Sequence, residues 1–178
     1  RVGDRHGEAR ALLALGGVAG NAGDIDRGSA FYAESLEVCR EAGDLRGVAT
    51  VLVNLGVLTY ARGDRAGAHR LFGEAIDLHR QTGDRVTLAL ALGNRSALSV
   101  QLGFHEAARA ELTEALQLSL ELDAVWGGTS AIATVGMLAL VRGDFASAAW
   151  MLAAATSCIE KSGLRLPGGQ RHEMNQMM

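Results

Sequence analysis

The chain has 178 residues, of which 48% are hydrophobic but only 4% are aromatic, and its formal net charge is −3. The lack of a basic block argues against nonspecific nucleic-acid binding, and two cysteines are too few for a disulfide framework or a zinc site. No apolar stretch reaches the ~20 residues of a membrane span, and no signal peptide opens the chain. We therefore expect a cytoplasmic protein without direct contact to nucleic acid or membrane, and the initial Arg1 indicates a fragment or a processed product.

The dipeptide Gly-Asp recurs along the chain at intervals of 20 residues or a multiple of 20. A glycine can close one helix in the left-handed conformation, and an aspartate can cap the first free N–H groups of the next helix. Ala and Leu, which supply much of the apolar content, favour helix between these points. The pattern predicts helices at about 4–22, 24–42, 44–62, 64–82, 84–102, 104–122, 124–142 and 144–162.

Alternate helices differ in sequence, so the full repeat is 40 residues long. In the first helix of each pair Gly16, Gly56 and Gly136 coincide, with Ser96 in the remaining copy. In the second helix, small residues and one large apolar residue coincide in the same way, which predicts close helix contacts with the large residue filling the adjoining space. The coinciding sets are Gly28, Ala68, Ala108 and Ala148; Tyr32, Phe72, Leu112 and Leu152; and Ser35, Ala75, Ala115 and Ala155.

This pattern resembles the tetratricopeptide repeat family, which pairs a Leu-Gly in the first helix with small and large apolar residues at fixed later offsets. The matches are LG…GD…G…Y…S, LG…GD…A…F…A and VG…GD…A…L…A, with a more degenerate copy, RS…GF…A…L…A. The resemblance implies an all-α, right-handed superhelical solenoid of four helix-turn-helix repeats over residues 1–162, at about 3–42, 43–82, 83–122 and 123–162. Residues 163–178 would form a C-terminal cap or tail, with Trp150 covered beneath it.

The repeat is longer than the family's common length of about 34 residues. Longer repeats with Gly-Asp at both turns are similar to the tetratricopeptide arrays of large bacterial transcriptional regulators, which carry an ATPase module elsewhere in the chain. The resemblance therefore implies the sensor or assembly arm of such a regulator.

The sequence does not favour a phosphate-binding loop, a metal site or a catalytic site. The glycine-rich stretch at 13–24 lacks both a preceding strand and the Gly-Lys-Ser/Thr of a phosphate loop. His69 and His79 lie about 280° apart around one helix, so they cannot share a metal ion, and we expect both on the surface. Glu111 and Glu114 are interpreted as solvated side chains on a helix face. We therefore predict no enzymatic activity, no metal site and no cofactor.

Candidate binding residues are those on the first helices that the repeat does not require, because first helices line the inner surface of such an array. Asn54 and Asn94 occupy one repeated position, where Ala14 and Thr134 stand in the outer copies. An Asn amide can hold an extended peptide backbone, which the resemblance also implies for this position; alternatively, the two residues cap or bridge neighbouring helices. The predicted concave groove comprises Val53, Asn54, Val57, Tyr60, Asn94, Ala97, Gln101, Thr134 and Met137, with Leu140 beside them.

The resulting functional prediction is a non-catalytic protein–protein interaction scaffold. Its partner would be a protein or peptide segment, including the option of another part of its own full-length chain, and end-to-end self-association is left open. The groove lacks the lysines and arginines that clamp a C-terminal carboxylate in some relatives, so an internal hydrophobic segment fits it better. The alternative is a sensor for a small, sugar-like effector. An RNA-reading repeat protein is disfavoured by the acidic net charge.

Overall fold

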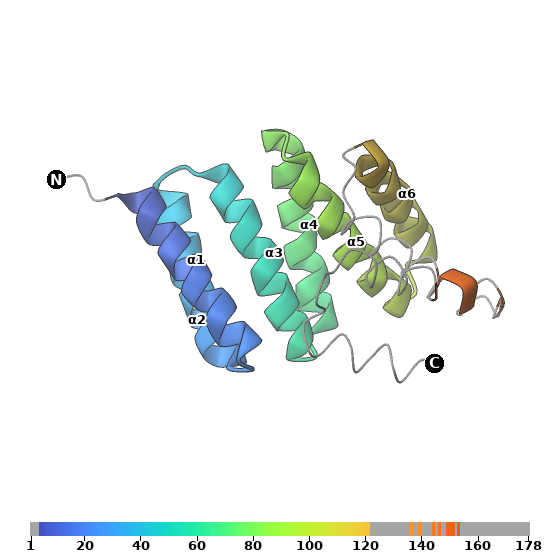
Figure 1. Ribbon diagram of the computed structural model, residues 1–178, viewed down its shortest axis with the longest axis horizontal. Helices are drawn as coiled ribbons and strands as arrows, with labels where there is room; N and C mark the ends of the chain where they lie inside the picture. Colours follow the sequence, from blue (N-terminus) through green and yellow to red (C-terminus); the bar gives the residue numbers. More distant parts are fainter. Residues whose placement is uncertain are drawn as a thin grey trace.

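The computed structural model describes residues 4–121 and, beyond them, residues 136, 139, 144, 146, 149–151 and 153. The first range folds into α1 (Arg5–Asn21), α2 (Ile25–Glu41), α3 (Leu45–Ala61), α4 (Arg65–Thr82), α5 (Arg85–Gln101) and α6 (His105–Glu121), and no strand occurs among the described residues. Consecutive helices pair into hairpins that stand side by side in a row (Figure 1). The expected all-α array of helical hairpins is confirmed, and the first six predicted helices agree with the observed ones to within one residue. The two helices predicted after residue 122 lie largely outside the described residues.

The turns between these helices share one construction. The Asp24 carboxylate accepts a hydrogen bond from the Arg27 N–H at 3.1 Å, which caps the start of α2. The N–H of Asp24 donates to the Ala19 carbonyl at 3.0 Å, and the same backbone bond joins Asp144 to Ala139 at 3.0 Å. The glycines in the turns between α1 and α6 all have φ between 66° and 90°: Gly23, Gly43, Gly63, Gly83 and Gly103. Four of them precede an aspartate, as the Gly-Asp pattern predicts, whereas Gly103 precedes Phe104.

Within each hairpin, a large side chain of the second helix fills the space left by a small residue of the first. A Cβ atom placed on Gly16 would lie 2.4 Å from the Tyr32 ring, and one on Gly56 would lie 2.8 Å from the Phe72 ring. In the third hairpin the buried Ser96 replaces glycine, and the smaller Leu112 stands where the rings stand. The other small residues predicted to permit close packing are also fully buried: Ser35, Ala68, Ala75, Ala108 and Ala115.

Successive hairpins stack through the first helix of one and the second helix of the one before. Leu58 on α3 comes within 2.9 Å of a Cβ placed on Gly28 of α2, so the missing side chain makes room for the leucine. Leu98, the equivalent residue of α5, packs in one apolar cluster with Ala68 and Phe72 of α4. The stack therefore repeats the same contact, large residue onto small, every 40 residues along the chain.

Ion pairs also recur with the repeat. Arg5 pairs with Glu41 at 3.0 Å across the first hairpin, and the equivalent Arg85 pairs with Glu121 across the third. These side chains are at least half exposed, so each pair contributes only about 0–1 kcal/mol to stability.

The sequence-based expectations about the burial of His79 and Trp150 are wrong. The His79 side chain is 0% exposed, because it occupies the buried position that Cys39 occupies in the first hairpin. Both of its ring nitrogens lack a hydrogen-bond partner among the described residues, and burial lowers its pKa. Trp150, expected beneath a covering segment, is 68% exposed. The C-terminal segment 163–178 lies outside the described residues.

Candidate functional site

The predicted groove residues fall on two neighbouring first helices. We call the side chains of Asn54, Val57, Tyr60, Asn94, Ala97 and Gln101 the first-helix surface. Val57 is 46% exposed although it is apolar, whereas Val53 is half-buried and packs into the clusters between the hairpins. Thr134, Met137 and the neighbouring Leu140 lie outside the described residues. Val57 is thus the accessible apolar residue of the surface, whereas Val53 belongs to the core.

The two asparagines differ in how their amides are used. The Asn54 Nδ2 donates to the Thr50 carbonyl of its own helix at 2.9 Å, which leaves its Oδ1 as a free acceptor. The Asn94 side chain makes no hydrogen bond to any residue in the described part of the chain. Both asparagines are half-buried. Asn94 therefore offers both a donor and an acceptor at this surface, and Asn54 offers an acceptor.

Tyr60 and Gln101 meet although they are 41 residues apart in sequence. The Gln101 Nε2 donates to the Tyr60 hydroxyl at 3.4 Å, and the Arg65 guanidinium donates to the Gln101 Oε1 at 2.9 Å. The predicted groove includes Tyr60 and Gln101 but not Arg65. Its place directly after the Gly63-Asp64 turn, at the start of a helix, is the feature of the sequence that points to it. The three side chains bring α3, α4 and α5 together at one edge of the first-helix surface and place a positive charge there.

A polar network joins the second and third hairpins. His69 Nε2 lies 3.0 Å from the Ser99 hydroxyl, which donates to the Glu111 carboxylate at 3.1 Å, and Arg95 pairs with Glu111 at 3.4 Å. The prediction that Glu111 is solvated is wrong, since it is only 9% exposed. The physical reason is a paired exchange: Arg95 and Glu111 occupy the repeat positions held by two leucines, Leu55 and Leu71, in the second hairpin.

Burial shifts the pKa of two side chains in this network, Glu111 and His69. Desolvation raises the pKa of Glu111, and Arg95 and the Ser99 hydrogen bond act in the opposite direction. Desolvation lowers the pKa of His69, and the nearby Arg95 lowers it further. Ser99 is fully buried and donates to the carboxylate instead of to the imidazole, so the order of groups differs from that of a catalytic triad. We therefore interpret the network as a contact that joins two hairpins.

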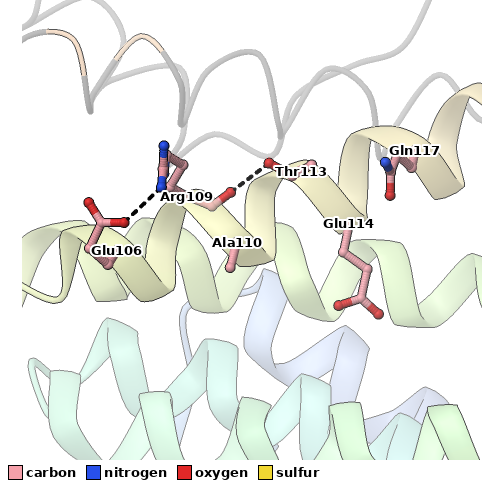
Figure 2. Close-up of a pocket in the computed structure, with 6 residues that line it drawn as sticks. All are labelled: Glu106, Arg109, Ala110, Thr113, Glu114 and Gln117. Carbon is pink, nitrogen blue, oxygen red and sulfur yellow. Dashed lines mark hydrogen bonds and ion pairs between the residues drawn. The ribbon is translucent and has the colours of Figure 1, made fainter.

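A cavity of about 470 Å³ lies along one face of α6. Figure 2 shows its lining side chains on that single helix, with Glu106 paired to Arg109 and Thr113 bonded to the Arg109 carbonyl. Glu106 and Arg109 correspond in the repeat to Asp26 of α2 and His69 of α4, which contact Arg62 and Ser99 of the following hairpin. The cavity therefore lies at repeat positions that, in the first two hairpins, face the next hairpin.

Neither a metal cluster nor a membrane-spanning helix occurs in the part of the chain that the structure describes. Among the described residues no three His, Cys, Asp or Glu side chains gather as metal ligands. None of the described helices is both long and apolar enough to cross a membrane.

Comparisons with known proteins agree with this architecture. The family model described as tetratricopeptide repeat matches residues 7–81, and no curated protein matches the chain. The structure of BtubC (BKLC) from P. vanneervenii is similar with a TM-score of 0.75 and 18% identity, over 94% of this chain and 69% of that one. The apo form of RapI is similar with a TM-score of 0.79 and 13% identity, over 92% of this chain and 60% of that one.

A Rap protein complexed with competence and sporulation factor is similar with a TM-score of 0.78 and 16% identity, over 88% of this chain and 44% of that one. At these identities the likeness concerns the fold, and the chain spans less than two thirds of each of the two Rap structures. The matched family and the observed hairpins together identify residues 7–81 as tetratricopeptide repeats, and α5 and α6 continue the same arrangement.

Proposed function

We propose that the chain is a cytoplasmic protein-interaction scaffold that binds a protein segment along the first-helix surface. The observation that carries the proposal is the exposed apolar Val57, which lies three residues after Asn54 on α3, with Asn94 at the equivalent position of α5. An exposed apolar residue together with hydrogen-bonding amides suits a segment that offers both side chains and a polar backbone.

The state of the amides determines what such a segment could bond. The Asn54 Oδ1 can accept from a backbone N–H, while the Asn94 amide can both donate to a carbonyl and accept from an N–H. An extended backbone presents these groups at regular intervals, whichever side chains it carries. The amides would then set the path of the segment, and Val57 and Ala97 would favour apolar side chains facing them.

The wider context of the chain is part of the proposal. We place the array in a larger bacterial regulator, as its sensor or assembly arm, with a segment of another protein or of its own full-length chain as the occupant. The 40-residue period with Gly-Asp turns supports this placement. The solved complex of a Rap protein with competence and sporulation factor supports a binding role for this architecture.

A peptide selection tests the proposal. Peptides selected from a random phage-displayed library would be measured by calorimetry against the unchanged chain and the double variant Asn54→Ala/Asn94→Ala. Alanine occupies the same position at Ala14, so the variant should keep its helicity. We expect each lost hydrogen bond to weaken binding by about 0.5–1.5 kcal/mol, roughly 2- to 10-fold, and Val57→Asp to weaken it further.

The matched control is Glu34→Ala/Glu74→Ala, two exposed residues at one repeated position of the second helices. Binding that survives the asparagine changes but fails in this control would place the working surface on the second helices. Failure to select any peptide, together with heat released on titrating a panel of mono- and disaccharides, would favour the small-molecule alternative.

A further inference from the structure

The turn between α5 and α6 departs from the Gly-Asp construction of the other turns. Phe104 stands where Asp24, Asp64 and Asp144 stand in the other repeats. A phenyl ring cannot accept hydrogen bonds from the first N–H groups of a helix as a carboxylate does. Phe104 is also 53% exposed, so its ring does not compensate for the lost cap by joining the core. The chain thus has a large apolar side chain at the surface where the equivalent turns have a capping aspartate.

The exposure of Phe104 belongs to its position in the repeat. The equivalent Asp24 and Asp64 are exposed although a further hairpin packs against each of their own hairpins, through α3 and through α5. Asp144 is exposed as well. Packing of a hairpin against α6 in the same way therefore leaves this position accessible to a partner.

Contacts link Phe104 to the positive charge at the edge of the first-helix surface. The ring centroids of Phe104 and His69 are 5.7 Å apart, and His69 follows Arg65 by one turn of α4. The Arg65 guanidinium in turn donates to Gln101, which lies three residues before Phe104. We call the side chains of Arg65, His69, Gln101 and Phe104 the turn patch. The patch is anchored to the body of the array, because His69 also lies 3.0 Å from the Ser99 hydroxyl.

The positive charge of the turn patch is not balanced within the described part of the chain. Arg65 forms no ion pair with any described residue, and its guanidinium donates to the uncharged Gln101 amide. Neither α3 nor α5 contains an aspartate or a glutamate. The Asp64 carboxylate caps α4, where it accepts from the Gly67 N–H at 2.8 Å. A negatively charged group of a partner can therefore pair with Arg65 without displacing an internal ion pair.

The turn patch continues the first-helix surface along α5, and Gln101 belongs to both. Asn94 and Gln101 are seven residues apart, nearly two full turns, so they share a face of the helix and lie about 10 Å apart along its axis. That length corresponds to about three residues of an extended chain. A segment whose backbone bonds to Asn94 therefore reaches the turn patch about three residues further on.

We propose that the segment bound along the first-helix surface carries an acidic side chain that pairs with Arg65 and, next to it, a large apolar side chain that packs on Phe104. The inference rests on the proposed function and adds the chemistry of the occupant, since the asparagines can hold any backbone whereas the turn patch selects side chains. The apolar contact supplies affinity, and the charge pair restricts which segments fit. A lysine or arginine at the same place is rejected, because like charges repel.

Selection from a random phage-displayed peptide library tests this specificity. Peptides recovered on the unchanged chain should be enriched, relative to the starting library, in Asp or Glu beside a large apolar or aromatic residue. Peptides recovered on Arg65→Glu should instead be enriched in Lys or Arg at that place. The matched control is Arg70→Glu, since Arg70 is exposed on the same helix but about 140° around its axis from Arg65. This control should give the same sequences as the unchanged chain.

Calorimetry with one recovered peptide measures each contact separately. Replacing the acidic residue of the peptide by its amide should weaken binding to the unchanged chain by up to about 5-fold but should leave binding to Arg65→Gln unaltered. Phe104→Ser should weaken binding by about 10-fold. Serine restores a capping side chain at the start of α6, so this variant should melt at a temperature no lower than that of the unchanged chain, as followed by circular dichroism.

The outcomes separate this inference from the proposed function. Peptides without acidic enrichment, or peptides that bind Arg65→Gln and Phe104→Ser as tightly as the unchanged chain, would overturn the inference. If such peptides still lose affinity for Asn54→Ala/Asn94→Ala, the proposed function stands without it. A library that yields no binding peptide would overturn both.

Discussion

Adding one methyl group at each of two adjacent glycines of α1 should change stability in opposite directions. A Cβ on Gly16 would lie 2.4 Å from two atoms of the Tyr32 ring, closer than real Cβ atoms approach other atoms, and the ring is only 5% exposed. A Cβ on Gly17 would meet only the Tyr32 hydroxyl, at an ordinary contact distance of 3.6 Å. Gly16→Ala therefore overpacks the first hairpin, and Gly17→Ala does not.

The magnitudes follow from two opposing terms. Replacing glycine by alanine inside a helix stabilises it by about 0.8–1.0 kcal/mol, and this term applies to both variants. Overpacking a core costs about 1–3 kcal/mol, and it applies to Gly16→Ala alone. The short distance to two ring atoms favours the upper part of that range. We expect Gly17→Ala to raise the free energy of unfolding by up to ~1 kcal/mol and Gly16→Ala to lower it by up to ~2 kcal/mol.

Urea unfolding followed by far-UV circular dichroism measures both variants, and their difference removes the shared propensity term. A third measurement adds Gly16→Ala to a Tyr32→Leu background, which reproduces the smaller side chain that Leu112 supplies in the third hairpin. The cost of the added methyl should shrink there, because the ring it meets is gone. Equal effects of the two glycine changes, or an undiminished cost in the leucine background, would refute the packing described for the first hairpin.

Three further outcomes are expected. Ala108→Phe should lower the free energy of unfolding by about 1–3 kcal/mol in urea titrations because the alanine is fully buried, whereas the same change at the exposed Ala107 should have little effect. Burial lowers the pKa of His79 in the folded chain. The stability that the neutral side chain contributes is therefore complete above about pH 6.5 and falls as the pH drops towards the folded-state pKa. The free energy of unfolding measured across this range should depend less on pH in His79→Leu. Arg95→Leu and Glu111→Leu should each destabilise the chain, while the double change, which reproduces the leucine pair of the second hairpin, recovers most of the loss; additive losses in that double-mutant cycle would contradict the pairing.

The features that recur in every repeat could be predicted from the sequence. The burial of residues that differ in type from their equivalents in the other repeats could not. Gly-Asp turns set the helix ends because glycine conformation and aspartate capping act over a few residues. His79 and Glu111 were misplaced because a polar residue taken alone suggests solvent. They occupy the repeat positions of Cys39 and Leu71, and it is this position in the repeat, not the polarity of the side chain, that determines their burial.

In the candidate site, too, the repeated positions could be predicted from the sequence and the individual contacts could not. The alignment of Asn54 with Asn94 follows from the period, but the hydrogen bond that occupies one amide and not the other depends on the neighbouring side chains. The contact between Tyr60 and Gln101 depends on the pitch at which hairpins stack, which no local pattern encodes.

The pairing of helices with their neighbours in the chain bears on how the protein is made. Among the described helices, the main packing joins consecutive helices and α1 with α3, so no contact waits for a distant part of the sequence. Helical proteins with such local contacts fold in microseconds to milliseconds, while the ribosome adds about 5–20 residues per second. A 40-residue repeat therefore takes seconds to emerge, far longer than it needs to pack on the hairpin before it. Synthesis would then extend the array hairpin by hairpin, and each new hairpin would cover the stacking face of the one before it.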